Sequence, residues 1–112
     1  MKKIEAIIRP ERLEDIKEEL NKLNVNGLTI SQVMGCGKQK GWKEYFRGQE
    51  VLLNVLPKTK LEIVVTDAQV ENIVDIIVNI ARTGDVGDGK IFIYDVLDTI
   101  RIRTGERGIG AV

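Results

Sequence analysis

The sequence predicts an α+β fold, a ferredoxin-like βαββαβ sandwich, because one strand–helix–strand pattern occurs twice and each copy has the apolar spacing of those elements. A shift of 57 positions brings Ile4 onto Leu61 and Leu20 onto Ile77. Two such units in tandem form the βαββαβ arrangement. A chain of 112 residues usually contains one core, so we expect a single domain over residues 1–112.

The first unit contains a strand over residues 3–8, a helix over residues 13–23 and a strand over residues 28–33. Its helix is predicted by apolar residues at spacings of 3, 4 and 3, from Leu13 to Leu23. Because such residues share one face of a helix, we expect this face to pack on the sheet.

The second unit repeats this order and ends in a strand over residues 90–96. Thr66-Asp-Ala-Gln69 has the form of a capping box, which predicts the start of its helix. A short further strand is expected over residues 99–105. A long segment, residues 36–55, connects the two units.

The predicted strands look apolar on both faces, with Val64 and Phe92 opposite the core-facing residues. Helices of this fold cover one face of the sheet, so the other would expose an apolar patch, which proteins that remain single chains rarely do. We therefore expect a homo-oligomer.

Composition limits the possible functions. Lys+Arg and Asp+Glu are equal at 17 each, and the chain lacks histidine, the commonest general base. The balanced charge argues against nucleic-acid binding, and no carboxylate cluster has metal-ligand spacing. The single Cys36 fits a reducing compartment, and no apolar run is long enough for membrane insertion. We expect a cytoplasmic protein that binds ligands without catalysis.

A glycine-rich loop over residues 82–90 is the first candidate site. It contains Gly84, Gly87 and Gly89 and is followed by Lys90, which suits a cradle for an anion. It is not a Walker motif, since Ile91 stands where that motif has Ser or Thr. A plain structural turn, with Gly84 ending the helix, is the alternative interpretation.

The C-terminal segment strengthens the anion hypothesis. Thr99-Ile-Arg-Ile-Arg103 alternates apolar and cationic residues, so a strand here would project Arg101 and Arg103 from one face. Two guanidinium groups together with Lys90 would grip a polyphosphate. In an oligomer, the loop and the arginines need not belong to one subunit.

Residues 35–56 show no sustained period but contain Gly35, Gly37, Gly41 and Gly48. Connections this long inside small domains usually carry function. The alternative is a simple β-hairpin extension.

Four motifs in order resemble the PII nitrogen-regulatory proteins, and the resemblance covers essentially the whole chain. They are Gly35-Cys-Gly-Lys-Gln-Lys-Gly41, Leu56-Pro-Lys58, Thr83-Gly-Asp-Val-Gly-Asp-Gly-Lys-Ile-Phe-Ile93 and Ile100-Arg-Ile-Arg-Thr-Gly105. The resemblance implies a homotrimer with nucleotide sites between subunits. It further implies sensing of ATP or ADP and, together with Mg-ATP, of 2-oxoglutarate.

The resemblance also implies roles for individual residues. Lys38 stands where the family usually has arginine. It keeps the positive charge but lacks the planar guanidinium group that can make two parallel hydrogen bonds. Gln39 would complete the Mg shell, and with Lys40, Gly41 and Lys58 it would hold 2-oxoglutarate. The implied nucleotide-binding residues are Thr29, Gly37, Lys38, Val64, Gly87, Asp88, Gly89, Lys90, Arg101 and Arg103.

Residues 36–55 would then be the effector loop, which acts on an ammonium channel or on an enzyme or regulator of nitrogen metabolism. Arg47 stands where family members that bind the channel insert an arginine, although an ordinary solvated charge is the alternative. Val51 replaces the modifiable tyrosine of many relatives, so we expect no covalent modification there. The functional alternatives are a small ATP-hydrolysing enzyme using the same cleft and an RNA-binding sheet, whose stacking aromatics are missing.

Overall fold

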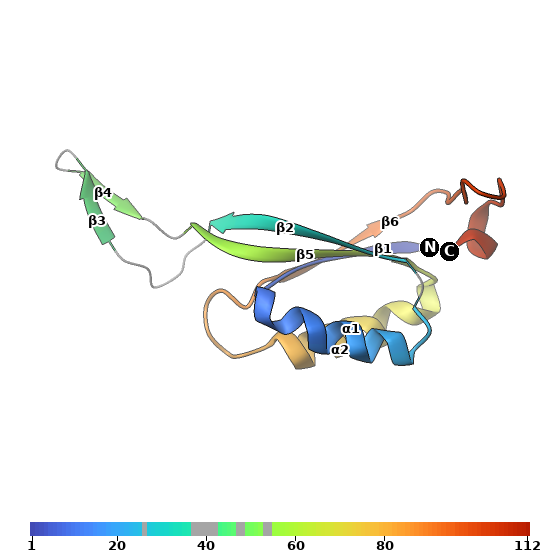
Figure 1. The fold of residues 1–112 in the computed structure, drawn as a ribbon, viewed down its shortest axis with the longest axis horizontal. Coiled ribbons are helices and arrows are strands. Elements are labelled where there is room, and N and C mark those ends of the chain that lie inside the picture. The colour runs from blue at the N-terminus through green and yellow to red at the C-terminus, as the bar shows by residue number, and fades with distance from the viewer. Residues whose placement is uncertain (26, 37–42, 47–48, 53–54) are drawn as a thin grey trace.

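The computed structural model describes residues 1–25, 27–36, 43–46, 49–52 and 55–112. Two helices cover one face of a four-stranded sheet (Figure 1). Short 3-10 turns lie at Pro10–Arg12, Asp67–Gln69 and Gly108–Ala111. The elements are β1 (Lys2–Ile8), α1 (Leu13–Lys22), β2 (Leu28–Cys36), β3 (Lys43–Phe46), β4 (Gln49–Leu52), β5 (Val55–Val65), α2 (Val70–Ala81) and β6 (Lys90–Asp95).

The strand order of the main sheet is β2-β5-β1-β6, and every neighbouring pair is antiparallel. Strand β1 lies between two strands of the second unit, with Ile4 opposite Ile63 on one side and Ile93 on the other. The two repeats therefore share one sheet and cannot fold as separate layers. This arrangement confirms the predicted ferredoxin-like fold.

The core lies between the sheet and the helices. In β1, Ile4, Ala6 and Ile8 alternate with more exposed residues and are at most 1% exposed. Burying one such side chain contributes about 1.5–3 kcal/mol. The buried helical residues are Ile16, Leu20, Val70, Ile73, Ile77 and Ala81. The predicted helix faces are confirmed except at Leu23, which follows the end of α1 and is 37% exposed.

The capping box before α2 is present as predicted. The backbone N–H of Thr66 donates to Oε1 of Gln69 at 3.1 Å. The hydroxyl of Thr66 also lies 3.1 Å from this oxygen. These bonds serve polar groups at the start of a helix that the helix itself leaves unpaired.

The open face of the sheet, which the helices do not cover, differs from the prediction because charged side chains pair across its strands. Lys3 Nζ lies 3.1 Å from Glu62 Oε2, and Lys60 Nζ lies 3.6 Å from both Glu5 Oε1 and Glu62 Oε1. The ammonium of Lys3 also lies 5.1 Å from the ring centroid of Tyr94.

The expectation of a second apolar face is therefore wrong over the centre of the sheet. Apolar side chains remain at its edge, where Phe92 of β6 is 45% exposed. The predicted oligomer now depends on other parts of the molecule.

The segment between the two units extends the sheet. Strands β2 and β5 remain paired as far as Cys36 and Val55 and reach beyond the helical layer (Figure 1). Strands β3 and β4 then pair with each other, with Phe46 opposite Gln49. The hairpin interpretation is thus correct for the described residues of this segment, whatever function the hairpin serves.

The strand expected over residues 99–105 is not present. Ile100 forms one isolated bridge with Arg107, and residues 102–104 form a turn. The backbone N–H of Gly105 donates to Arg101 O at 2.7 Å, and Gly105 has φ = 71°. A residue with positive φ and a local hydrogen bond close the turn, so the two arginines do not project from one strand face.

Candidate anion-binding site

The glycine loop connects α2 to β6. The helix ends at Ala81, and Arg82 already has extended backbone angles, φ −69° and ψ 127°. Gly84, Gly87 and Gly89 have φ values of 93°, 103° and 105°, a region that favours glycine. Three residues with positive φ within six positions allow the loop to turn sharply back to the sheet.

Gly89 also allows the loop to touch the sheet. A Cβ atom at this position would lie 1.7 Å from the carbonyl oxygen of Ile7 on β1. A Cβ at Gly84 would meet nothing within 4 Å. Gly89 is therefore required by both backbone angle and space, whereas Gly84 is required by backbone angle alone.

The carboxylate of Asp88 holds the loop together from inside. Its Oδ2 accepts the backbone N–H groups of Thr83 at 2.8 Å and Gly84 at 2.9 Å. Its Oδ1 accepts the hydroxyl of Thr83 and, at 3.4 Å, Nε of Arg9. These donors, the Thr83 hydroxyl first among them, hold the pKa of Asp88 well below its usual range. Its side chain thus determines the shape of the loop.

Two cations fasten the middle of the loop, Arg9 directly after β1 and Lys58 of β5. Nη2 of Arg9 donates to Val86 O at 3.2 Å, and Nζ of Lys58 donates to Gly87 O at 2.6 Å. Lys58 is only 8% exposed, and burial, with the nearby charge of Arg9, lowers its pKa. Burial of an ammonium is costly unless it is hydrogen-bonded, and Gly87 O supplies that bond.

Arg9 is a residue that sequence reasoning missed. It lies 79 positions from Asp88 in the chain, and the only local signal, the strand-ending Arg9-Pro10 pair, gives no hint of that contact. Lys58 was predicted as a site residue, but its bond to the glycine loop was not. A Cβ at Gly35 would lie 2.8 Å from Cγ of Lys58, so Gly35 leaves room for the lysine stem beside β2.

Lys90 follows the loop as the first residue of β6 and is exposed. A hollow of about 320 Å³ lies beside it, between α2 and β6, with mainly apolar walls that include Val74, Ile77 and Ile91. Asp88, Gly89 and Lys90 form its polar end. The structure therefore brings the predicted loop residues and Lys90 to one place.

The remaining predicted nucleotide-binding residues lie elsewhere in the single chain. Thr29 of β2 and Val64 of β5 lie toward the opposite end of the sheet, where Thr29 pairs with Glu62. Arg101 and Arg103 follow β6, at the end where Val96 N donates to Met1 O. Six residues along β1 correspond to roughly 20 Å between the two ends of the sheet. Figure 1 shows the glycine loop and the C-terminal segment at opposite ends of the molecule.

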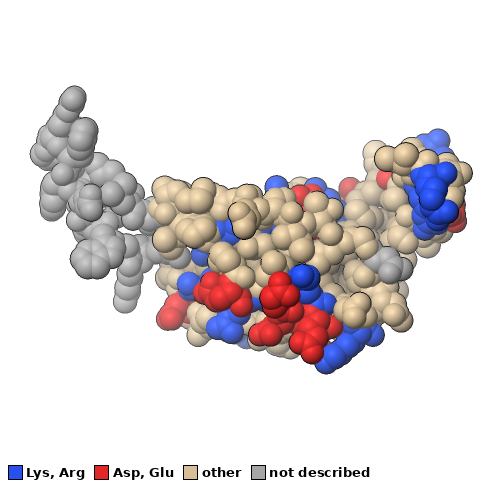
Figure 2. Space-filling view, in the orientation of Figure 1, with Lys and Arg blue, Asp and Glu red and all other residues tan. Residues whose placement is uncertain are grey.

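Arg101 is held within its own segment. Its Nη1 donates to Glu106 Oε2 at 2.8 Å and its Nη2 donates to Gly110 O at 3.2 Å. Nearby, Nη2 of Arg107 lies 2.7 Å from Asp98 Oδ2. Figure 2 shows basic side chains gathered over the C-terminal segment, apart from the acidic side chains of the helical layer.

Six predicted residues lie outside the described parts of the chain: Gly37, Lys38, Gln39, Lys40, Gly41 and Arg47. Residue 51, in β4, is Val as the sequence states, with no tyrosine hydroxyl to modify. Among the described residues, no group of three or more His, Cys, Asp or Glu side chains could hold a metal ion. No helix in the described chain is long and apolar enough to span a membrane.

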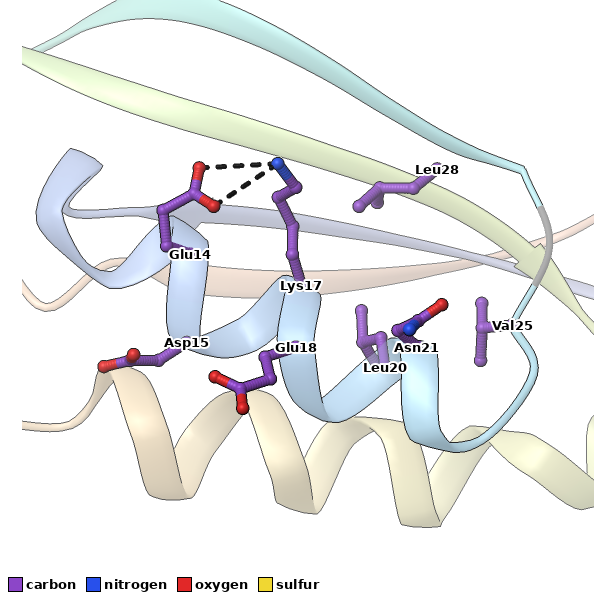
Figure 3. A pocket seen from close by; sticks show the side chains of 8 residues that line it. All are labelled: Glu14, Asp15, Lys17, Glu18, Leu20, Asn21, Val25 and Leu28. Carbon is purple, nitrogen blue, oxygen red and sulfur yellow. Dashed lines mark hydrogen bonds and ion pairs between the residues drawn. The ribbon is translucent and has the colours of Figure 1, made fainter.

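A second hollow, of about 490 Å³, lies beside α1 and is unsuited to an anion (Figure 3). Glu14, Asp15 and Glu18 form its rim, and Nζ of Lys17 is paired with Glu14 Oε1 at 3.4 Å. Because three carboxylates and only one ammonium line this hollow, its net charge is negative and repels phosphate. The glycine loop is therefore the better candidate for an anion site.

The fold and the loop together define a class of small ferredoxin-like domains with a glycine loop packed against the sheet. The family model described as nitrogen regulatory protein P-II matches residues 1–106. The chain belongs to this family, which confirms the resemblance seen in its motifs, and its role is in nitrogen-regulatory signalling.

Relatives agree over the full length of the chain. The nitrogen regulatory protein P-II of Pasteurella multocida is 52% identical over 112 residues, 100% of both chains. That of Klebsiella oxytoca is 51% identical, and the nitrogen regulatory protein P-II 1 of Escherichia coli K12 is 50% identical, again over 100% of both chains. These relatives are named as regulatory proteins.

Proposed function

We propose that this chain is a non-enzymatic sensor that binds ATP or ADP and, with Mg-ATP, also 2-oxoglutarate. In this proposal the bound ligand sets the conformation of residues 36–55. That loop then controls an ammonium channel or an enzyme or regulator of nitrogen metabolism in the cytoplasm. The observation that carries the proposal is the glycine loop, which is fastened from inside by Asp88 and followed directly by Lys90.

The chemistry of Lys58 supports the dicarboxylate part of the proposal. Its ammonium has three donors, and one of them is used by Gly87 O. The stem of Lys58 passes Gly35 at the root of the 36–55 segment. A carboxylate at this root would therefore find a desolvated cation, while Gln39 would complete the shell of Mg bound to the nucleotide.

The placement of the arginines supports a homotrimer with sites between subunits. Lys90 lies at one end of the sheet, and Arg101 and Arg103 lie at the other. A phosphate site that uses all three cations thus requires at least two subunits. Charge-assisted hydrogen bonds of this kind contribute roughly 1.5–3 kcal/mol each, so several of them suit micromolar nucleotide binding after ordering costs.

Calorimetry with ATP and ADP, with and without Mg and 2-oxoglutarate, tests this function. We expect both nucleotides to bind and 2-oxoglutarate to bind only in the presence of Mg-ATP. Light scattering on the same samples should give the mass of a trimer. Absence of nucleotide binding would overturn the proposal, and absence of 2-oxoglutarate binding would reduce it to an energy sensor. Steady phosphate release that Lys90→Ala abolishes would instead favour the hydrolase alternative.

A further inference from the structure

Two neighbouring carbonyl groups of the glycine loop are turned toward the sheet. Val86 O accepts from Arg9 at 3.2 Å, and Gly87 O accepts from Lys58 at 2.6 Å. The two cations lie on the same side of the loop, close enough for the charge of Arg9 to lower the pKa of Lys58. Like charges that approach each other in this way need acceptors to hold them, and the loop provides two.

The geometry of the peptide unit then fixes the opposite side of the loop. In a trans peptide the C=O and the N–H of the next residue point in opposite directions, and the described chain contains no cis bond. Because the carbonyls of Val86 and Gly87 point to the sheet, the N–H groups of Gly87 and Asp88 point away from it. Two adjacent outward N–H groups form a concave anion-binding nest.

Three amides at the start of the loop are already used. Asp88 Oδ2 accepts the N–H groups of Thr83 and Gly84, and the Thr83 hydroxyl oxygen accepts that of Asp85 at 3.2 Å. Within the described residues, neither Gly87 N nor Asp88 N donates to the chain. The loop therefore separates amides that stabilise it from amides that remain for a ligand.

We propose that Arg9 and Lys58 are positioning residues for the phosphate group: they anchor the carbonyls of Val86 and Gly87 and so aim the N–H groups of Gly87 and Asp88 at the ligand. This inference rests on the proposed nucleotide function. It gives Arg9 a role and gives Lys58 a second one, independent of 2-oxoglutarate. Gly35 takes part because a side chain there would displace the lysine stem.

Arg9 acts through two contacts at once, since Nε reaches Asp88 Oδ1 and Nη2 reaches Val86 O. Lysine at this position keeps the positive charge but cannot make both contacts. Comparing Arg9→Gln with Arg9→Lys therefore distinguishes aiming of the loop from general attraction of phosphate by charge.

ADP affinity, measured by calorimetry without Mg and without 2-oxoglutarate, is the first test. We expect Arg9→Gln and Lys58→Gln each to weaken ADP binding by about tenfold, the scale of one lost hydrogen bond to a charged group. Arg9→Lys should recover only part of the loss. The control, Lys17→Gln, removes one positive charge from the exposed face of α1 and should bind ADP as the unaltered chain does.

Full ADP affinity in Arg9→Lys would show that only the charge at this position matters. Full ADP affinity in Lys58→Gln would show that Lys58 does not position the glycine loop for phosphate binding. Either result overturns that residue's part of the inference. Because a failure of the unaltered chain to bind ADP would defeat the proposed function instead, a second test uses no ligand.

The second test follows the backbone amides of Gly87 and Asp88 by NMR in the ligand-free protein. Arg9→Gln and Lys58→Gln should shift these two signals and speed their hydrogen exchange, while the amide signals of the core strand β1 around Ala6 stay in place. Unchanged signals for Gly87 and Asp88 in both variants would overturn the inference whether or not nucleotide binds.

Discussion

The two ends of the sheet carry two cationic regions of different kinds. At one end, the glycine loop of residues 82–89 has its polar groups joined to the sheet and to each other. At the other end, the C-terminal segment of residues 97–112 has arginines paired within the segment and apolar side chains exposed, with Leu97 and Ile102 each 99% exposed.

This difference shows which half of the proposed site one chain completes alone. The loop has a fixed shape because contacts across the sheet determine it. The C-terminal segment contains apolar surface that its own chain does not cover, and its predicted ligand-binding arginines lie far from the loop. We expect substitutions in the loop to change its conformation and lower the stability of the single chain. We expect substitution of the ligand-binding arginines in the C-terminal segment to affect only ligand binding by the assembled protein.

The largest effect is expected for Gly89→Ala. A methyl group there would lie 1.7 Å from Ile7 O, and φ is 105°. Relieving both requires the loop to leave β1, so we expect a stability loss of at least about 2 kcal/mol, measured by urea unfolding.

Gly84→Ala is the matched control, because φ is 93° but a Cβ has open space. It should cost about 1 kcal/mol, the strain of the backbone angle alone. Equal losses in the two variants would show that contact with β1 does not determine the loop.

These contacts mark the limit of what the sequence could predict. Period and capping signals depend on residues three or four apart, so the helices, the core faces and the Thr66–Gln69 box were predicted correctly. Arg9 meets Asp88 across 79 positions, and only the folded sheet reveals that proximity.

The two structural errors have similar causes. The face opposite the helices was judged from single strands, whereas its charges pair only when β1 lies beside β5, as in Lys3 with Glu62. The Thr99–Arg103 alternation suggested a strand, but Glu106 and the positive φ of Gly105 favour a turn. In both cases a contact with residues outside the predicted strand determined the structure, and the pattern within that strand did not reveal the contact.

A smaller effect, one that depends on pH, is expected at Asp88. The native pKa of this carboxyl is held below the value of about 3.9 for an unfolded chain. Its contribution to stability is therefore complete above the unfolded pKa and is lost as pH falls through the native pKa. The urea midpoint of the unaltered chain should fall between pH 5 and pH 2, and Asp88→Asn should show a smaller fall from a lower starting value.

Asp85→Asn is the control for this experiment, since it removes a carboxylate from the same loop while leaving the Thr83 and Gly84 amides with Asp88. It should keep the pH dependence of the unaltered chain. If Asp88→Asn kept the full dependence too, the carboxylate would not be what holds the loop.

The smallest effect on the single chain is expected for Arg101→Ala. Its pair with Glu106 is partly exposed, with 37% and 46% of the two side chains accessible, and such pairs are worth less than about 1 kcal/mol. Arg107→Ala removes the neighbouring pair with Asp98 and should have an equally small effect on the urea midpoint.

The two variants should differ in the affinity of the assembled protein for ADP. Arg101→Ala should weaken it by about tenfold because a charge-assisted bond to phosphate is lost, while Arg107→Ala should leave it unchanged. A chain can therefore lose almost no stability and still lose a ligand that binds to a neighbouring subunit. If both variants bound ADP normally, Arg101 would be outside the nucleotide site.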